Sequence, residues 1–288
     1  MDSCYLCEST DLILRKGEVR DAPAINILEC NDCGLVSLDS VAHIHSSFYE
    51  NSGMHGEQLK PIEDWLKETH WDDQRRFEQL KPLLANRRVL DFGCGAGGFL
   101  SNAKSLAADA VGVELETRVR DFYENSDITI FPSIEDATSP LSGGGYDVIT
   151  AFHVVEHLPD PREILKKLGT MLKYDARMVI EVPSADDALL TLYDCDAFQR
   201  FTYWSQHLYL FSAPTLATLV KQAGLRVISI QHYQRYPLSN HLHWLSKSEP
   251  GGHQRWSFLN NPAINHAYAE VLASIGKTDT LIAHVEKR

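Results

Sequence analysis

Two acids and a glycine-rich stretch have the types and spacing needed to bind a nucleoside cofactor. Asp91 ends a short apolar run, the loop 93–98 that follows contains four glycines, and Glu114 lies twenty-three positions beyond Asp91. Glycines let the backbone turn tightly and approach a ligand, and a carboxylate at the end of the next strand can accept hydrogen bonds from both ribose hydroxyls. The glycines also satisfy G-x-G-x-x-G, so a nicotinamide-dependent enzyme stays open as an alternative.

A second group of polar residues, His153, Glu156 and His157, spells H-x-x-E-H. This is a zinc-protease signature when it lies on a helix, but here it directly follows an apolar run and leads into two closely spaced prolines, which a helix does not accommodate. At the end of a parallel strand these side chains would face the ligand crevice. We therefore expect His157, His153, Glu156 and the later His207 near the reacting atoms, with a histidine as general base. A merely structural role for His157, and a divalent ion at Glu156 and His157, remain alternatives.

Four cysteines near the start of the chain form two C-x-x-C pairs: Cys4, Cys7, Cys30 and Cys33. Four thiolates complete a tetrahedral zinc site with no open catalytic position, so the pattern predicts structural zinc. A module of about forty residues has too small a core to fold without such a ligand. Cys94 and Cys195 stand alone and are assigned no task.

Composition limits the partners. Lys and Arg total 27 against 39 Asp and Glu, a formal net charge of −12, which disfavours a nucleic-acid partner. No run approaches the about eighteen apolar residues of a membrane span, and the first twenty residues lack the layout of a secretion signal, so we expect a cytoplasmic protein. The oligomeric state is not defined by the sequence.

The elements that must position these residues alternate between strand and helix from residue 87 onward. We expect a Rossmann-like α/β fold with a seven-stranded mixed sheet and helices on both faces, plus a small zinc-ribbon-like module at residues 1–40. A helical connector or cap is expected at 41–86, the main domain at 87–288, and an insertion within it at 236–277. The strands are expected at 89–92, 111–114, 128–131, 146–152, 178–182, 225–230 and 280–285.

The stretch Val-Leu-Asp-Phe-Gly-Cys-Gly-Ala-Gly at 89–97 resembles the first motif of class I S-adenosylmethionine-dependent methyltransferases. Residues 146–161, 180–184, 206–212 and 223–225 are similar to later segments of these enzymes, so the resemblance covers about 87–288. In that family the acid and the glycines hold the methionine end of the cofactor. The family often places an acid near the adenine after the third strand, where this chain has Ser133 and, slightly later, Glu135 and Asp136. The resemblance implies a cofactor site made of Asp91, Phe92, Gly93, Cys94, Gly95, Gly97, Glu114, Phe152 and His153.

The fusion of a zinc module to such a domain is similar to bacterial methyltransferases of sugar and cell-surface polysaccharide biosynthesis. This resemblance implies methyl transfer to a small hydroxylated acceptor, which aromatic and hydrogen-bonding side chains of the insertion would bind. The alternative is that the insertion only packs on the domain. An RNA methyltransferase, a nicotinamide-dependent enzyme and a catalytically silent cofactor-binding subunit remain alternatives. The candidate acceptor residues are Tyr209, Arg235, Tyr236, Asn240, His241 and His243.

Overall fold

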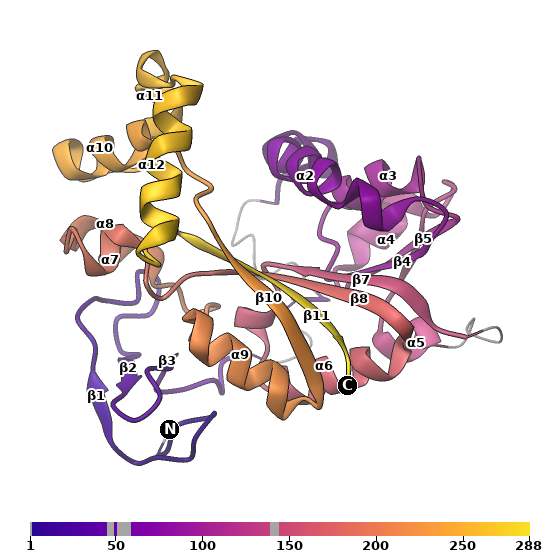
Figure 1. Ribbon diagram of the computed structural model, residues 1–288, viewed down its shortest axis with the longest axis horizontal. Coiled ribbons are helices and arrows are strands. Elements are labelled where there is room, and N and C mark those ends of the chain that lie inside the picture. The colour runs from indigo at the N-terminus through magenta and orange to yellow at the C-terminus, as the bar shows by residue number, and fades with distance from the viewer. Residues whose placement is uncertain (1, 45–48, 51–58, 139–143) are drawn as a thin grey trace.

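The computed structural model describes residues 2–44, 49–50, 59–138 and 144–288. Its main element is a seven-stranded sheet with the order β10-β11-β8-β7-β4-β5-β6 (Figure 1). The pairings from β6 through β8 are parallel, whereas β11 pairs antiparallel with both β8 and β10. The strands are β4 (Arg88–Phe92), β5 (Asp109–Val113), β6 (Thr129–Phe131), β7 (Tyr146–Phe152), β8 (Leu172–Pro183), β10 (Leu225–Tyr233) and β11 (Thr280–Lys287).

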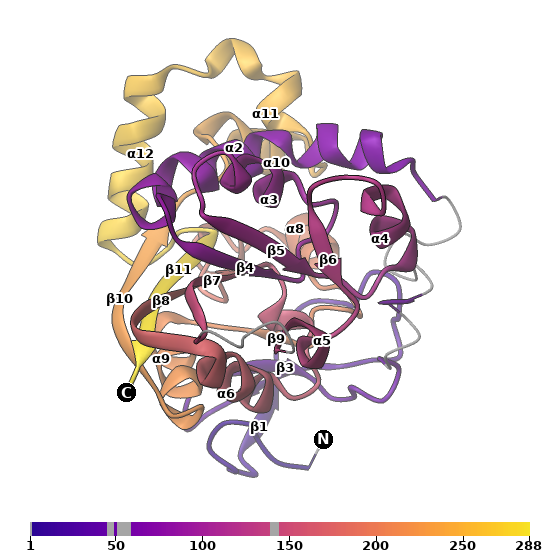
Figure 2. The same cartoon turned by 90° about the vertical axis from the view of Figure 1, so that its right-hand side faces the viewer.

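Helices cover both faces of this sheet, as Figures 1 and 2 show. On one face lie α2 (Ile62–Leu84), α3 (Gly98–Lys104) and α4 (Thr117–Tyr123), and on the other α5 (Ile134–Thr138), α6 (Pro161–Met171) and α9 (Ala213–Gln222). The central strands read as unbroken apolar runs because both of their faces are buried, and Val89 and Leu90 of β4 are fully covered. The predicted fold class is therefore confirmed.

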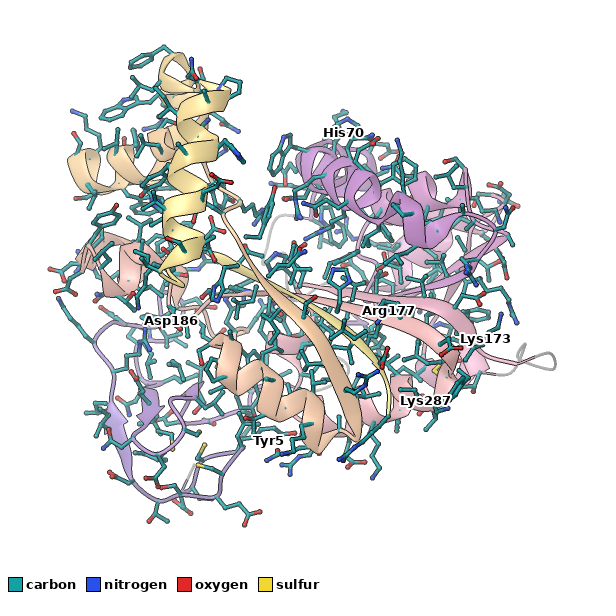
Figure 3. All side chains as sticks on the ribbon, in the orientation of Figure 1. Tyr5, His70, Lys173, Arg177, Asp186 and Lys287 are labelled. Carbon is teal, nitrogen blue, oxygen red and sulfur yellow. The ribbon has the colours of Figure 1, made fainter. Side chains whose placement is uncertain are left out.

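The central helix α2 packs its apolar stripe onto the sheet. Phe77, Leu80 and Leu84 follow the spacing of one helical face and join the core with Val89 and Val148. Its opposite face is solvated, and Figure 3 shows His70 there. None of the helices that the structure describes has the length and apolar character needed to cross a bilayer.

The predicted strand boundaries lie within three residues of those in the structure, except at the start of β8. Strand β8 begins at Leu172, six residues before the predicted start. The H-x-x-E-H segment contains a 3-10 turn, η2 (Val155–His157), and no α-helix, as its position before the two prolines predicted. The insertion folds into α10 (Leu238–Lys247), α11 (Gly252–Arg255), η3 (Ser257–Leu259) and α12 (Pro262–Ser274), with α7 (Ala188–Thr191) and α8 (Asp196–Thr202) nearby (Figure 1).

The N-terminal module forms a second, antiparallel sheet with the order β1-β2-β3-β9. Its fourth strand comes from the main domain, so the two parts share one hydrogen-bonded sheet. Tyr5, labelled in Figure 3, adds a contact at the start of α6, where its hydroxyl donates to Asp160. The strands are β1 (Leu12–Leu14), β2 (Ile27–Cys30), β3 (Val36–Leu38) and β9 (Tyr209–Leu210).

The four N-terminal cysteines converge at one end of this sheet. The Sγ atoms of Cys4 and Cys33, and those of Cys7 and Cys30, are 3.5 Å apart, and one ligand atom from each residue lies within 4.8 Å of all the others. Four Zn–S bonds of about 2.3 Å in a tetrahedron put sulfurs about 3.8 Å apart, whereas a disulfide needs about 2.05 Å. The cluster therefore fits a structural zinc ion held by these four thiolates.

Removing one of these thiolates should release zinc and destabilise the whole chain, because the module shares its sheet with β9. We expect Cys30→Ser to lose one equivalent of zinc and to lower the melting temperature. Metal analysis and thermal unfolding measure the two effects, with Cys94→Ser as the control that keeps its zinc. A wild-type protein that takes up no zinc, with all six thiols titratable, would contradict the assignment.

Candidate functional site

A cavity of about 520 Å³ opens at the carboxyl ends of β4, β5 and β7. Strand β4 has β5 on one side and β7 on the other, so the cavity lies where the strand order of the parallel sheet reverses, the usual ligand position in such sheets. Eight of the nine predicted cofactor residues line it: Asp91, Phe92, Gly93, Cys94, Gly95, Glu114, Phe152 and His153. The ninth, Gly97, does not line the cavity; with φ 79° it forms the turn that leads from the loop into α3.

The glycine loop is compressed between two side chains. Gly93 and Gly95 have φ values of 67° and 52°, in the left-handed region that favours glycine. A Cβ on Gly93 would lie 2.5 Å from Val154, and one on Gly95 would lie 3.2 Å from the ring of Trp65. Since both neighbours line the cavity, the loop backbone itself forms part of the cavity wall.

Glu114 holds this loop in place. Its Oε2 accepts a hydrogen bond from the amide of Gly95 at 3.0 Å, and its Oε1 accepts one from the amide of Glu116, also at 3.0 Å. Burial raises the pKa of Glu114 above its usual value, although these backbone hydrogen bonds oppose the shift. The carboxylate thus joins the ends of β4 and β5 at the cavity wall.

Asp91 is almost completely buried beneath the loop. Its Oδ1 accepts a hydrogen bond of 2.7 Å from the hydroxyl of Thr150 on the neighbouring strand. Burial raises the pKa of Asp91 to about 7. The carboxyl is therefore poised to ionise when a positive charge enters the cavity.

His153 is held between two carboxylates. Its Nδ1 lies 3.2 Å from Oε1 of Glu156, and its Nε2 lies 3.2 Å from Oε1 of Glu181. Burial opposes a charge on this ring, but the two acids outweigh it and raise the pKa of His153. The arrangement favours the imidazolium form, which cannot accept a proton.

His157 and His207 lie together beside Glu156. Their ring centroids are 4.9 Å apart, and Nε2 of His157 is 3.9 Å from Oε1 of Glu156. Burial lowers the pKa of His157. Burial and the nearby His157 ring together lower the pKa of His207 to about 3. Both rings are therefore neutral near pH 7, and His157 lines the cavity.

These three side chains have unused polar atoms. Oε2 of Glu156 and Nδ1 of both His157 and His207 are buried without a hydrogen-bond partner among the described residues. One ligand atom from each residue lies within 4.8 Å of the other two. The group could accept a proton from a bound acceptor or hold a divalent ion.

Of the predicted acceptor residues, the structure brings Arg235 to the cavity. The other five lie outside its lining. The Tyr209 hydroxyl donates to the carbonyl of Pro159 at 3.2 Å, and Nδ1 of His241 lies 2.7 Å from the Tyr268 hydroxyl. Tyr236 packs against the guanidinium of Arg235.

The remaining two, Asn240 and His243, are buried inside the helical insertion. His243 contacts the carbonyl of Glu249 through Nδ1 at 2.9 Å, and Trp244 of the same helix packs on Leu189. His241 and His243 therefore make contacts within the insertion, as the packing alternative from the sequence expects.

Sequence reasoning named no site residue in α2, which lies in the segment expected to be a helical connector or cap. Trp65, Asp72, Asp73 and Arg76 of this helix line the cavity. A signal existed, because Asp73 and Arg76 fall on the same helical stripe as Phe77 and therefore face the core. A run of charged residues is usually solvated, so the sequence alone favours an exposed position for Asp73 and Arg76.

Near the expected adenine end, Ser133 and Glu135 line the cavity, together with Leu115 and Ile134. The Ser133 hydroxyl donates to Asp136 at 2.6 Å. Of the two acids after the third strand, Glu135 on the first turn of α5 lines the cavity, and Asp136 does not.

Solved structures with a similar fold include proteins described as S-adenosylmethionine-dependent methyltransferases. One from Archaeoglobus fulgidus is 21% identical with a TM-score of 0.53, and the alignment covers 77% of this chain and 99% of that protein. Another, from Thermotoga maritima, is 18% identical with a TM-score of 0.52, and 85% of this chain covers 100% of it. At these identities the likeness concerns the fold alone.

Sequence relatives carry the name ubiquinone biosynthesis O-methyltransferase. The protein from Burkholderia pseudomallei is 25% identical over 205 residues, which are 63% of this chain and 88% of the relative. The protein from Paraburkholderia phytofirmans is 27% identical over 207 residues, 64% of this chain and 89% of the relative. A family model described as a methyltransferase domain matches residues 66–230, more than half of the chain. The cavity, the glycine loop and this match together place the chain in the methyltransferase domain family, as an S-adenosylmethionine-dependent methyltransferase.

Proposed function

We propose that the chain transfers the methyl group of S-adenosylmethionine to a hydroxyl oxygen of a small acceptor and that His157 takes the proton. The observation that carries this proposal is the contrast between neighbouring histidines in one cavity. Two carboxylates raise the pKa of His153 and favour its charged form, whereas burial lowers the pKa of His157, which lies beside a carboxylate that can stabilise it once protonated. A neutral imidazole next to an acid suits a general base.

The cofactor is proposed to lie with its methionine end at Asp91 and the glycine loop, its ribose at Glu114 and its adenine between Leu115 and Ile134. All of these groups line the same cavity, in the order in which the strands bring them to the edge of the sheet. Gly95 and Glu114 are already joined by a hydrogen bond, which supports their acting on one ligand together. This orientation leaves the end of β7, with His153 and His157, for the reacting atoms.

The reaction is an in-line substitution at the methyl carbon. The acceptor oxygen forms the new bond to carbon as the bond to sulfur breaks, sulfur leaves as the neutral thioether, and the hydroxyl proton moves to His157. The protein positions the two reactants and keeps the base unprotonated before the step. Glu156 then lies beside the imidazolium that the step creates.

The acceptor is proposed from the sequence relatives and from the zinc module. The relatives are named O-methyltransferases, and the zinc-module resemblance points to sugar or polysaccharide precursors, so a hydroxyl acceptor is common to both. We propose a sugar-related hydroxyl compound as the acceptor and keep a phenolic one as the second candidate. The net charge of −12 argues against RNA.

Glu114→Ala should weaken S-adenosylmethionine binding by about tenfold to a hundredfold, because the ribose and the glycine loop both lose a charged acceptor. Isothermal titration of the full chain measures this change. The exposed acid Glu124, replaced by alanine, serves as the control. An unchanged affinity in Glu114→Ala would show that the ribose lies elsewhere.

Cofactor affinity should rise with pH. Because burial raises the pKa of Asp91 to about 7, the carboxyl is mostly protonated at pH 6 and mostly ionised at pH 8, and the positively charged cofactor favours the ionised form. We expect S-adenosylmethionine to bind about tenfold more tightly at pH 8 than at pH 6, and Asp91→Asn to flatten this dependence. Titrations at both pH values decide it, and a slope that survives in Asp91→Asn would assign the titration to another group.

His157→Gln should lower kcat by about a hundredfold to ten-thousandfold, the usual contribution of a general base, with little change in cofactor affinity. Nucleotide sugars and catechols are assayed first with the wild type by release of S-adenosylhomocysteine. Since burial lowers the pKa of His157, wild-type activity should persist at pH 6.5 and fall only in more acidic buffer. Full turnover by His157→Gln on an accepted substrate would exclude it as the base.

A further inference from the structure

Helix α2 carries four charged residues that are buried: Asp72, Asp73, Arg75 and Arg76 are exposed by 7%, 7%, 9% and 9%. Charged side chains are rarely buried unless they are paired, because removing a charge from water costs several kcal/mol. The partners of each charged group therefore indicate its role.

Two of the four have their charged groups paired inside the protein, although Nε of Arg75 is buried without a hydrogen-bond partner among the described residues. Arg75 donates to Oε1 of Glu181 at 2.8 Å and to Gln79 at 3.1 Å. Asp72 accepts hydrogen bonds of 2.9 Å from Nε of Arg235 on both of its oxygens. These contacts tie α2 to β8 and to the end of β10, which is a structural role.

Asp73 and Arg76 are satisfied only in part. Oδ2 of Asp73 is buried without a hydrogen-bond partner among the described residues. Its Oδ1 lies 3.7 Å from Nη1 of Arg76, longer than a hydrogen bond, while Nε and Nη2 of Arg76 are both used by Glu181. Each residue thus keeps one charged group available, and both line the cofactor cavity.

The position of Asp73 relates it to the glycine loop. A Cβ on Gly98, where the loop enters α3, would collide with Oδ2 of Asp73, so the carboxylate lies directly against the loop's end. Arg76 lies 4.7 Å from the ring centroid of Phe152, at the end of β7. The two opposite charges therefore stand side by side above the part of the cavity proposed for the methionine end.

We infer that Asp73 and Arg76 form the receptor for the amino-acid end of the cofactor, with Asp73 binding its α-ammonium group and Arg76 its α-carboxylate. An amino acid carries one positive and one negative group on the same carbon, which matches one free carboxylate oxygen and one free guanidinium nitrogen in a buried wall. This inference rests on the proposed placement of the cofactor and makes α2 a specificity element of the site.

The test compares two ligands that differ only at this end. S-adenosylhomocysteine has the amino-acid group, and 5′-methylthioadenosine has the same nucleoside and thioether without it. Both are titrated calorimetrically into the full-length wild type and into Asp73→Asn and Arg76→Gln. Arg75→Gln is the matched control, because Arg75 binds the same Glu181 oxygen and is equally buried but lies outside the cavity lining.

We expect Asp73→Asn and Arg76→Gln each to weaken S-adenosylhomocysteine about tenfold or more, as for loss of a charge-assisted hydrogen bond, and 5′-methylthioadenosine by less than about threefold. Arg75→Gln should change both affinities by the same factor. Arg76→Lys, which keeps the charge next to Glu181, should retain part of the preference if Arg76→Gln is too unstable to study.

Equal losses for both ligands in Asp73→Asn and Arg76→Gln, or an unchanged affinity for S-adenosylhomocysteine, would overturn the inference and leave the proposed function intact. A wild-type protein that binds neither ligand would instead overturn the proposed cofactor site.

Discussion

One carboxylate, that of Glu181 at the end of β8, joins the parts that form the cavity. Its Oε1 receives Nη2 of Arg75 at 2.8 Å and Nη2 of Arg76 at 2.7 Å, and it lies 3.2 Å from Nε2 of His153. Glu181 is 1% exposed, and burial alone would oppose its ionisation, but these cations hold its pKa well below the usual value. Because the desolvation of several charges is offset at this single atom, loss of any one partner leaves the others uncompensated in a dry interior.

This junction also explains the backbone at His153. The residue has φ 54°, a left-handed conformation that costs a non-glycine side chain about 1–3 kcal/mol and persists only where surrounding contacts enforce it. Glu156 and Glu181 hold the ring from both nitrogens. The chain reverses here between β7 and η2, and the turn brings His157 to the cavity wall.

The sequence predicted the sheet and the glycine loop because their signals are local. Unbroken apolar runs indicate strands buried on both faces, and positive φ values require glycine at Gly93 and Gly95 whatever the rest of the chain does. No local signal predicts that Glu181 pairs with the arginines of α2, because the partners are about a hundred residues apart in the sequence and meet only when the helix packs on the sheet. Five of the six predicted acceptor residues lie outside the cavity lining, and a sequence alone does not separate acceptor-binding side chains from those that join helices, as His241 and Tyr268 do.

The N-terminal module gains a clearer physical role from the strand it shares. The segment that carries His207 is held by the module at several points: Asp21 accepts from the amide and hydroxyl of Ser205, and the amide of Leu38 donates to the carbonyl of Leu208. On its other side, the amide of Leu208 donates to the carbonyl of Glu156. The position of the His157 and His207 pair therefore depends on the sheet that the four cysteines close. A module used only for docking a partner would not need these contacts, so they favour a role for the module in positioning the His157 and His207 pair.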